Sequence, residues 1–208
     1  IYDNRDGTYT AYLSYVNTTG APLQAPIGDG SETKNFFTPG AQSRGQPAVF
    51  KDGESSGEFY FTFKGEALTW VIKVKGGEEM RISISAQSPK LPYVQPIAEC
   101  IDMNQRGQLI AVLGYSNPND FDIHLPVGTL NRFSPGKDDR AQPEQFFSGL
   151  NKGAFSVPFA AALEWKLPGM VASVSPKSEV CSCPTSNTAV TKNRVLKTSE
   201  ELGMLVFE

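Results

Sequence analysis

Short segments in which polar and apolar residues alternate recur along the chain. A period of two is typical of a β-strand with one face against a core, because successive side chains of a strand point to opposite faces. Four such segments are TYTAYLSYVN (8–17), MRISISAQ (80–87), QLIAVLGYSN (108–117) and MVASVS (170–175). Two longer segments each predict two strands joined by a short turn, FYFTFKGEALTWVIKV (59–74) and AFSVPFAAALEWKL (154–167). Without a convincing helix among them, these segments predict an all-β protein.

The two halves of the chain repeat one another. At an offset of 100, six residues match six others: Gly7, Ala11, Tyr15, Asn17, Pro26 and Gly28 match Gly107, Ala111, Tyr115, Asn117, Pro126 and Gly128. After four extra residues in the first copy the offset is 96, and Asn35, Phe37, Pro39, Arg44, Gln46, Pro47 and Phe50 match Asn131, Phe133, Pro135, Arg140, Gln142, Pro143 and Phe146. Leu68 and Trp70 then match Leu163 and Trp165. Ordered matches with small gaps indicate a duplicated domain.

The repeat and the strand pattern together predict two tandem immunoglobulin-like antiparallel β-sandwich domains. We place these domains at 1–90 and 91–184, followed by a C-terminal tail at 185–208 that has no counterpart in the first copy and contains a short apolar strand candidate, GMLVF. In an assembly this tail could be an exchanged strand that adds to the sheet edge of a neighbouring copy. The repeated tryptophans, Trp70 and Trp165, are expected at the centre of the two cores, because a large aromatic ring gains most from burial.

The ends of the copies carry two further expectations. The segment 88–99 between the copies contains three prolines, which have no N–H to donate to a β-ladder, so we predict an extended connector there. Continued backwards, the offset of 100 puts the counterpart of Cys100 just before Ile1, which leads us to expect that the chain is part of a longer array or a product of cleavage at that point.

Composition and charge narrow the classes of partner. The 208 residues are 39% hydrophobic, enough to fill ordinary cores. The net charge of −3 offers no broad positive field, so we expect no nucleic-acid partner. No segment approaches the roughly 20 apolar residues needed to cross a bilayer, so we expect no membrane insertion.

Three cysteines bear on the compartment. A disulfide between Cys100 and either Cys181 or Cys183 would join the start of the second domain to its end. Such a bond predicts an oxidising setting, outside the cell or at its surface.

Catalytic chemistry is poorly supported. His124 is the single histidine, Asp122 lies two residues before it on the same strand face, and the counterpart of His124 in the first copy is Gln24. Hydrolytic catalysis needs a nucleophile with a positioned base, so we predict that the protein is not an enzyme.

Calcium binding remains an alternative to the absence of a cofactor. The acidic turns DGSE (29–32), NPNDFD (117–122) and KDD (137–139) could supply oxygen ligands to calcium, but none has the spacing of a complete calcium loop. We therefore expect no cofactor, with calcium as the alternative.

Asn17 begins an Asn-Thr-Thr glycosylation triplet, whereas its counterpart Asn117 is followed by proline. A turn-forming role shared by both asparagines is favoured over glycosylation of Asn17.

The most prominent repeated motif is SRGQPAVF (43–50), which returns as DRAQPEQF (139–146). Guanidinium groups donate in a fixed fork that suits backbone carbonyls, glutamine both donates and accepts, and proline stiffens a turn. We interpret the motif as a clamp on a long loop, with a carboxylate-binding pocket as the alternative. The residues of this clamp are Arg44, Gln46 and Pro47 in the first copy and Arg140, Gln142 and Pro143 in the second.

The combined pattern GYSNPN, LPVGTLNRFSPG, RAQP and LEW in the second copy resembles a repeat found in tandem in large secreted and cell-surface proteins. The resemblance covers about 1–176 and is weaker in the first copy. It carries no known activity and implies an extracellular protein. We therefore expect a structural or adhesive building block of a surface filament, fibre or matrix, whose partners are further copies of itself or other surface proteins. The alternative is a carbohydrate-binding or cell-adhesion module, with or without calcium, whose partners include glycans.

Overall fold

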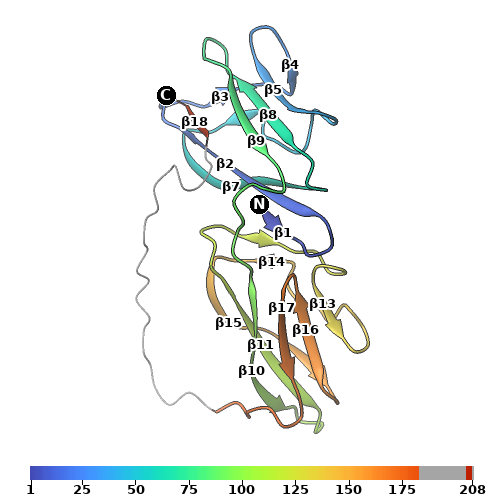
Figure 1. Cartoon of the computed structure of the whole chain (residues 1–208). Helices are drawn as coiled ribbons and strands as arrows, with labels where there is room; N and C mark the ends of the chain where they lie inside the picture. Colours follow the sequence, from blue (N-terminus) through green and yellow to red (C-terminus); the bar gives the residue numbers. More distant parts are fainter. Residues whose placement is uncertain (183–204, 208) are drawn as a thin grey trace. The chain divides into compact units, whose positions relative to one another are not determined.

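The computed structural model describes residues 1–182 and 205–207 of the chain. The described residues form strands, turns and bends and no helix, so the predicted all-β class is confirmed (Figure 1). It follows that none of them belongs to a helix able to cross a membrane. The chain divides into two compact units, the first made of Ile1–Leu91 with the strand at 205–207, and the second beginning at Pro92.

The first unit is built on two principal sheets. In one, β2 pairs with β1, β7 and β18, and in the other the order is β4-β5-β8-β9. A short ribbon of β3 and β6 accompanies them. The strands are β1 (Tyr2–Asp3), β2 (Tyr9–Asn17), β3 (Leu23–Gln24), β4 (Gly28–Asp29), β5 (Lys34–Thr38), β6 (Val49–Phe50), β7 (Gly53–Phe63), β8 (Leu68–Lys73), β9 (Met80–Ile84) and β18 (Leu205–Phe207).

The second unit repeats this plan. Its sheets have the orders β10-β11-β15 and β13-β16-β17, with a ribbon of β12 and β14. The strands are β10 (Gln95–Met103), β11 (Leu109–Asn117), β12 (Ile123–His124), β13 (Arg132–Ser134), β14 (Gln145–Phe146), β15 (Gly149–Phe159), β16 (Leu163–Leu167) and β17 (Met170–Val174). All the pairings of this unit's named strands are antiparallel.

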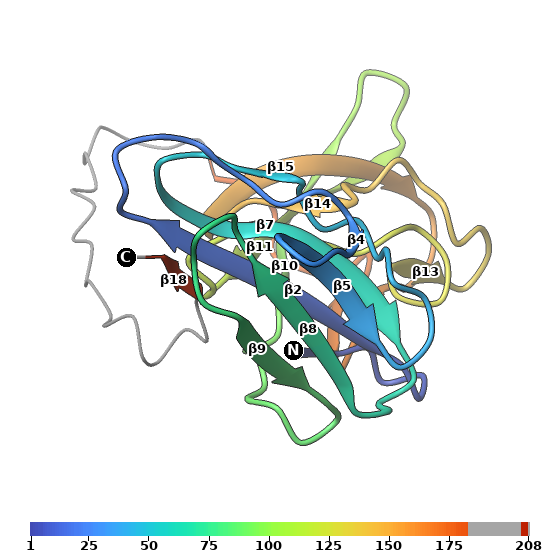
Figure 2. The same cartoon turned by 90° about the horizontal axis from the view of Figure 1, so that it is seen from above.

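Aromatic rings join the two sheets of each unit into a sandwich-like core. In the first unit, Phe37 of β5 contacts Phe59 and Phe61 of β7, with ring centroids 6.3 and 5.0 Å apart. Trp70 of β8 meets Phe59 edge to face at 5.2 Å and is fully buried. Figure 2 shows β5, β8 and β9 lying over β2 and β7. Burial of these rings across the gap is the main force that holds the sheets together.

The second core uses the equivalent residues. Trp165 of β16 meets Phe155 of β15 edge to face at 4.8 Å and stacks on Phe133 of β13 at 6.1 Å. Its indole is 1% exposed. The apolar positions predicted from period-two alternation therefore face one another, as the strand pattern requires.

The predicted connector over 88–99 is wrong in its second half. Strand β10 begins at Gln95 and continues through Pro96, which pairs with Tyr115 of β11. A proline is tolerated here because the other side of β10 at this point carries no ladder that would need its N–H. A bulge between Ala98 and Cys100 follows, and it shifts the register of the rest of the strand.

Candidate functional site

A buried asparagine forms the centre of the long loop in the second unit. The Nδ2 of Asn131 donates to the backbone oxygens of Leu125 (3.0 Å) and Pro143 (2.8 Å). Its Oδ1 accepts from Nε1 of Trp165 at 2.9 Å. Asn131 is fully buried, so every polar atom of its amide group is satisfied inside the protein.

Gln142 completes this loop from the other side. Its Oε1 accepts from the backbone N–H of Arg140 at 2.8 Å, and its Nε2 donates to the carbonyls of Asn131 (3.2 Å) and Asp138 (2.9 Å). Together with the Pro143 carbonyl, these bonds tie the Arg-x-Gln-Pro segment to the core tryptophan through Asn131. We call the connected set Asn131, Gln142, Pro143 and Trp165 the loop network of the second unit.

The loop network recurs in the first unit, atom for atom. Asn35 donates to the carbonyls of Ala25 and Pro47, both at 2.8 Å, and accepts from Nε1 of Trp70 at 3.0 Å. Gln46 accepts from the N–H of Arg44 (2.7 Å) and donates to the carbonyls of Gln42 (2.8 Å) and Asn35 (3.4 Å). The motif therefore has the same internal partners in both copies.

The two arginines of the motif differ in what their side chains contact. Arg140 donates to the carbonyls of Pro158 (3.1 Å) and Pro135 (3.4 Å) and lies over the ring of Phe133. The guanidinium of Arg44 lies over Phe61, with its central carbon 5.1 Å from the ring centroid, and makes no hydrogen bond to any described residue. A cation over a ring face contributes about 0.5–1 kcal/mol at an exposed site. Only Arg140 reaches backbone carbonyls through its side chain.

This difference leads to a prediction. Arg140→Lys is expected to lower the free energy of unfolding of the second unit by about 1–2 kcal/mol, because lysine cannot reproduce two fixed N–H donors. The matched change Arg44→Lys should cost the first unit less, since an ammonium keeps part of the ring contact. Chemical denaturation of the two variants measures both effects, and an equal loss in the two would contradict the assignment.

A second pair of buried asparagines ends β2 and β11. The Nδ2 of Asn17 donates to the carbonyls of Ala21 (2.8 Å) and Phe50 (3.0 Å), and its Oδ1 accepts from the backbone N–H of Thr19 (3.1 Å). Asn117 bonds the carbonyls of Phe121 and Phe146 in the same way, both at 2.9 Å.

These bonds bear on Asn17 as the glycosylation candidate. Asn17 is 0% exposed, and a glycan on Nδ2 would replace one of its two donated hydrogens and needs space that a buried side chain lacks. The folded first unit therefore does not present Asn17 as an acceptor. The asparagine instead closes the turn after the strand, which is a common use of this side chain.

A tyrosine hydroxyl on each central strand accepts a backbone N–H. Tyr15 accepts from Lys51 at 2.9 Å and Tyr115 from Phe147 at 3.1 Å. Burial raises the pKa of Tyr115, the N–H of Phe147 opposes this rise, and the negative charge of Asp122 adds to it. The phenol therefore stays neutral and serves as an acceptor that fixes the start of the following strand.

Asp122 directly precedes β12, and His124 is the last residue of that strand. The carboxylate of Asp122 accepts from Nε2 of Gln145 (2.9 Å) and from the backbone N–H of Ser148 (3.2 Å). His124 pairs with Gln145 across the short β12–β14 ribbon. The acid is thus engaged in joining two loop segments.

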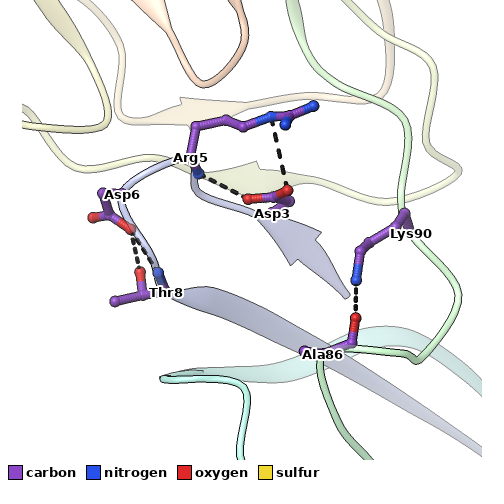
Figure 3. A network of polar contacts seen from close by, with 6 residues as sticks. All are labelled: Asp3, Arg5, Asp6, Thr8, Ala86 and Lys90. Carbon is purple, nitrogen blue, oxygen red and sulfur yellow. Dashed lines mark hydrogen bonds and ion pairs between the residues drawn. The ribbon is translucent and has the colours of Figure 1, made fainter.

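A further acidic turn, which was not among the calcium candidates, follows β1 and is held by its own residues. Figure 3 shows the turn after β1, where the Asp6 carboxylate accepts from the N–H (2.9 Å) and hydroxyl (2.6 Å) of Thr8. Asp3 accepts from the N–H of Arg5 at 2.9 Å and lies 3.7 Å from its Nε, and nearby Lys90 donates to the carbonyl of Ala86. No group of three or more His, Cys, Asp or Glu suited to a metal ion occurs in the described part of the chain.

The acidic turn at 29–32 faces a cation. Lys34 Nζ lies 3.3 Å from Asp29 and 3.0 Å from Glu79, and Glu79 also meets Arg81 at 2.6 Å. The hydrogen bonds that Lys34 donates to Glu79 and Asp29 raise the pKa of Lys34, whereas Lys34 and Arg81 lower the pKa of Glu79. These charges balance one another at the surface, where such pairs contribute little to stability.

One disulfide joins Cys100 of β10 to Cys181. The backbone beside it is held by bonds from Ile101 N–H to the Glu179 carbonyl (2.8 Å) and from Cys181 N–H to the Ile101 carbonyl (2.9 Å). Of the two pairings expected for Cys100, the one with Cys181 forms. Cys183 lies outside the described residues, as does most of the tail 185–208.

No known protein family, curated protein or solved structure matches this chain. The function therefore has to be argued from its own residues.

The sequence singled out the Arg-x-Gln-Pro motif but assigned no role to Asn35 and Asn131, which the structure places between that motif and the tryptophans. A signal for them was present. The asparagine lies at the same distance before the glutamine in both copies. A polar residue inside an apolar strand pattern needs hydrogen-bond partners if it is buried.

Proposed function

We propose that this protein is an extracellular structural or adhesive building block in which two copies of one domain act as rigid modules of a surface filament, fibre or matrix. The observation that carries the proposal is the use of the repeated polar residues. The loop network of each unit is satisfied by its own backbone and tryptophan. Side chains repeated to hold a fold, with no repeated base or nucleophile, suit a module whose task is mechanical spacing or assembly.

The proposal includes a finer assignment of the fold, two immunoglobulin-like sandwiches in tandem. Two sheets that enclose a buried tryptophan in each unit, antiparallel except for the pairing of β18 with β2, support it. The disulfide of the second unit joins the first strand of that unit to the segment after its last strand, which differs from the inter-sheet bond of antibody domains. The likeness therefore concerns architecture.

The setting outside the cell is supported by the same disulfide. Bonds of this kind persist in oxidising environments and are rare in the reducing cytosol. Both cysteines of the bond are partly exposed to solvent.

Assembly of the purified chain tests the proposal. A concentration series followed by analytical ultracentrifugation and electron microscopy should show ordered oligomers or filaments whose spacing repeats the two-unit chain. A chain that stays monomeric up to the millimolar range, alone and with extracts of the cell surface, contradicts the proposal.

A second function is favoured by one specific observation. Tyr12 of β2 and Tyr60 of β7 pair across the sheet with ring centroids 5.4 Å apart, and Tyr60 is 45% exposed. Aromatic faces near solvent suit the stacking of sugar rings. A glycan array with and without a calcium chelator tests this carbohydrate-binding alternative. Tyr60→Ala should abolish a genuine signal, and Tyr93→Ala in the second unit serves as the control.

A further inference from the structure

The first unit completes its sheet with a strand from the far end of the chain. Strand β7 pairs along one side of β2, from Tyr9 to Asn17. On the other side β1 pairs with Tyr9 and Thr10 only, and β18 pairs in parallel with Tyr15–Asn17. The residues 11–14 of β2 lie between these two pairings. This edge of the sheet is therefore covered in two short pieces.

The same edge in the second unit is covered by a single strand. Strand β10 pairs with β11 from Leu109, opposite Met103, to Ser116, opposite Gln95. It is also fixed covalently through Cys100. In the first unit, β18 thus takes the place that the beginning of β10 holds in the second, but in the opposite direction.

The pairing of β18 has the properties of an exchangeable contact. Its three residues, Leu205–Phe207, form few backbone hydrogen bonds, each worth only about 0.5–1.5 kcal/mol net. The long segment 183–204 separates β18 from the last described residue of the second unit. When such a strand moves to the identical site on another copy, it makes the same contacts there, so the exchange costs little free energy.

We propose that the edge of β2 around Tyr15–Asn17 is a strand-acceptor site, and that its donor in an assembly is β18 of a second copy of this chain. This inference rests on the proposed function, because it names the contact by which the building blocks join. Backbone hydrogen bonds supply the affinity of strand addition and alternate side chains supply its specificity. Donor and acceptor are different surfaces, so the contact is heterologous and can continue from chain to chain.

Concentration decides between pairing within a chain and pairing between chains. Because β18 belongs to the same chain as its acceptor edge, its effective concentration there is on the order of millimolar. The strand pairs within its own chain in dilute solution, and neighbouring copies compete when the local concentration reaches that range. Assembly by this contact should therefore depend steeply on concentration.

A mixed cross-linking experiment tests the contact directly. Val16 and Val206 are opposite residues in the parallel register, so cysteines at these positions are close enough to bond. Full-length Val16→Cys and Val206→Cys chains, both also carrying Cys183→Ser to remove a competing thiol, are mixed at increasing concentration and oxidised mildly. The expected product is a disulfide-linked heterodimer whose yield rises with concentration.

Two matched variants control the experiment. Val171→Cys, at an exposed position of the second unit, replaces Val206→Cys and should give no specific link. Leu205→Pro, added to the Val206→Cys chain, removes a backbone donor of β18 and should reduce the yield at least tenfold, whereas Thr191→Pro should not. An undiminished yield with Leu205→Pro, or no heterodimer up to the millimolar range, overturns the inference.

A truncation separates this inference from the proposed function. If the chain without residues 205–208 forms the same assemblies as the intact chain, strand exchange is wrong and the structural role stands. If the intact chain assembles and the truncated chain does not, both are supported. If neither assembles but the heterodimer forms, strand exchange stands and the structural role fails.

Discussion

Asn131→Ala is expected to lower the free energy of unfolding of the second unit by about 3–5 kcal/mol. The substitution leaves three buried groups without their partner, Nε1 of Trp165 and the carbonyls of Leu125 and Pro143. Each unsatisfied buried polar group costs about 1–3 kcal/mol. A loss of this size is a large part of the stability of a typical domain, so the unit should be partly unfolded at moderate temperature.

Calorimetry with both units present provides the measurement. Asn131→Ala should lower the unfolding temperature of the second unit alone, and Asn35→Ala should do the same to the first, because the loop networks are separate. Gln105→Ala, at an exposed position, serves as the control and should lie within about 0.5 kcal/mol of the parent chain. Asn131→Asp is a stricter test, since a buried carboxylate keeps the acceptor for Trp165 but loses both donors. A loss below about 1 kcal/mol in Asn131→Ala contradicts the central role of this residue.

Loss of the disulfide is expected to lower the free energy of unfolding of the second unit by about 4 kcal/mol. Cys100 and Cys181 are separated by 81 residues, and closing a loop of this length restricts the unfolded chain by about that amount. The first unit contains no cysteine. Reduction should therefore shift one of two unfolding transitions and leave the other in place.

The variants Cys100→Ser and Cys181→Ser should reproduce the effect of reduction, while Cys183→Ser should not. Urea denaturation with and without dithiothreitol measures all of them. If reduction shifts both transitions equally, the disulfide acts on more than the unit that contains it, and the two-unit description is wrong.

Much of the fold was predictable because alternation and repetition are local signals. Period-two segments located β2, β9, β11 and β17 to within a few residues, and the matching residues of the two halves gave the same strand plan twice. The cysteine pairing narrowed to two choices for the same reason, since Cys100 and the CSC sequence lie at the ends of one copy. Composition and pattern are sufficient to predict the strands when one face of each strand is buried.

What escaped prediction depended on long-range pairing. Strand β10 contains Pro96 and lacks clear alternation, and its existence follows from β11, whose edge it covers. Asn35 and Asn131 were marked only by their repetition, because the indoles that they accept from, those of Trp70 and Trp165, lie 35 and 34 residues away in the sequence. The pairing of β18 with β2 joins residues from opposite ends of the sequence, and no local pattern specifies such a partner.

The position of the disulfide determines how the chain bears tension. A force applied to the two ends of the second unit acts on the chain close to β10 and after Cys181. The Cys100–Cys181 bond therefore transmits this force covalently. The residues enclosed by that bond are shielded from the pull. The first unit contains no cysteine and so no disulfide that could carry the force. Its sheets are held by hydrogen bonds and packing alone. Under strain the first unit should therefore extend before the second, so that the chain combines an extensible element with a nearly inextensible one.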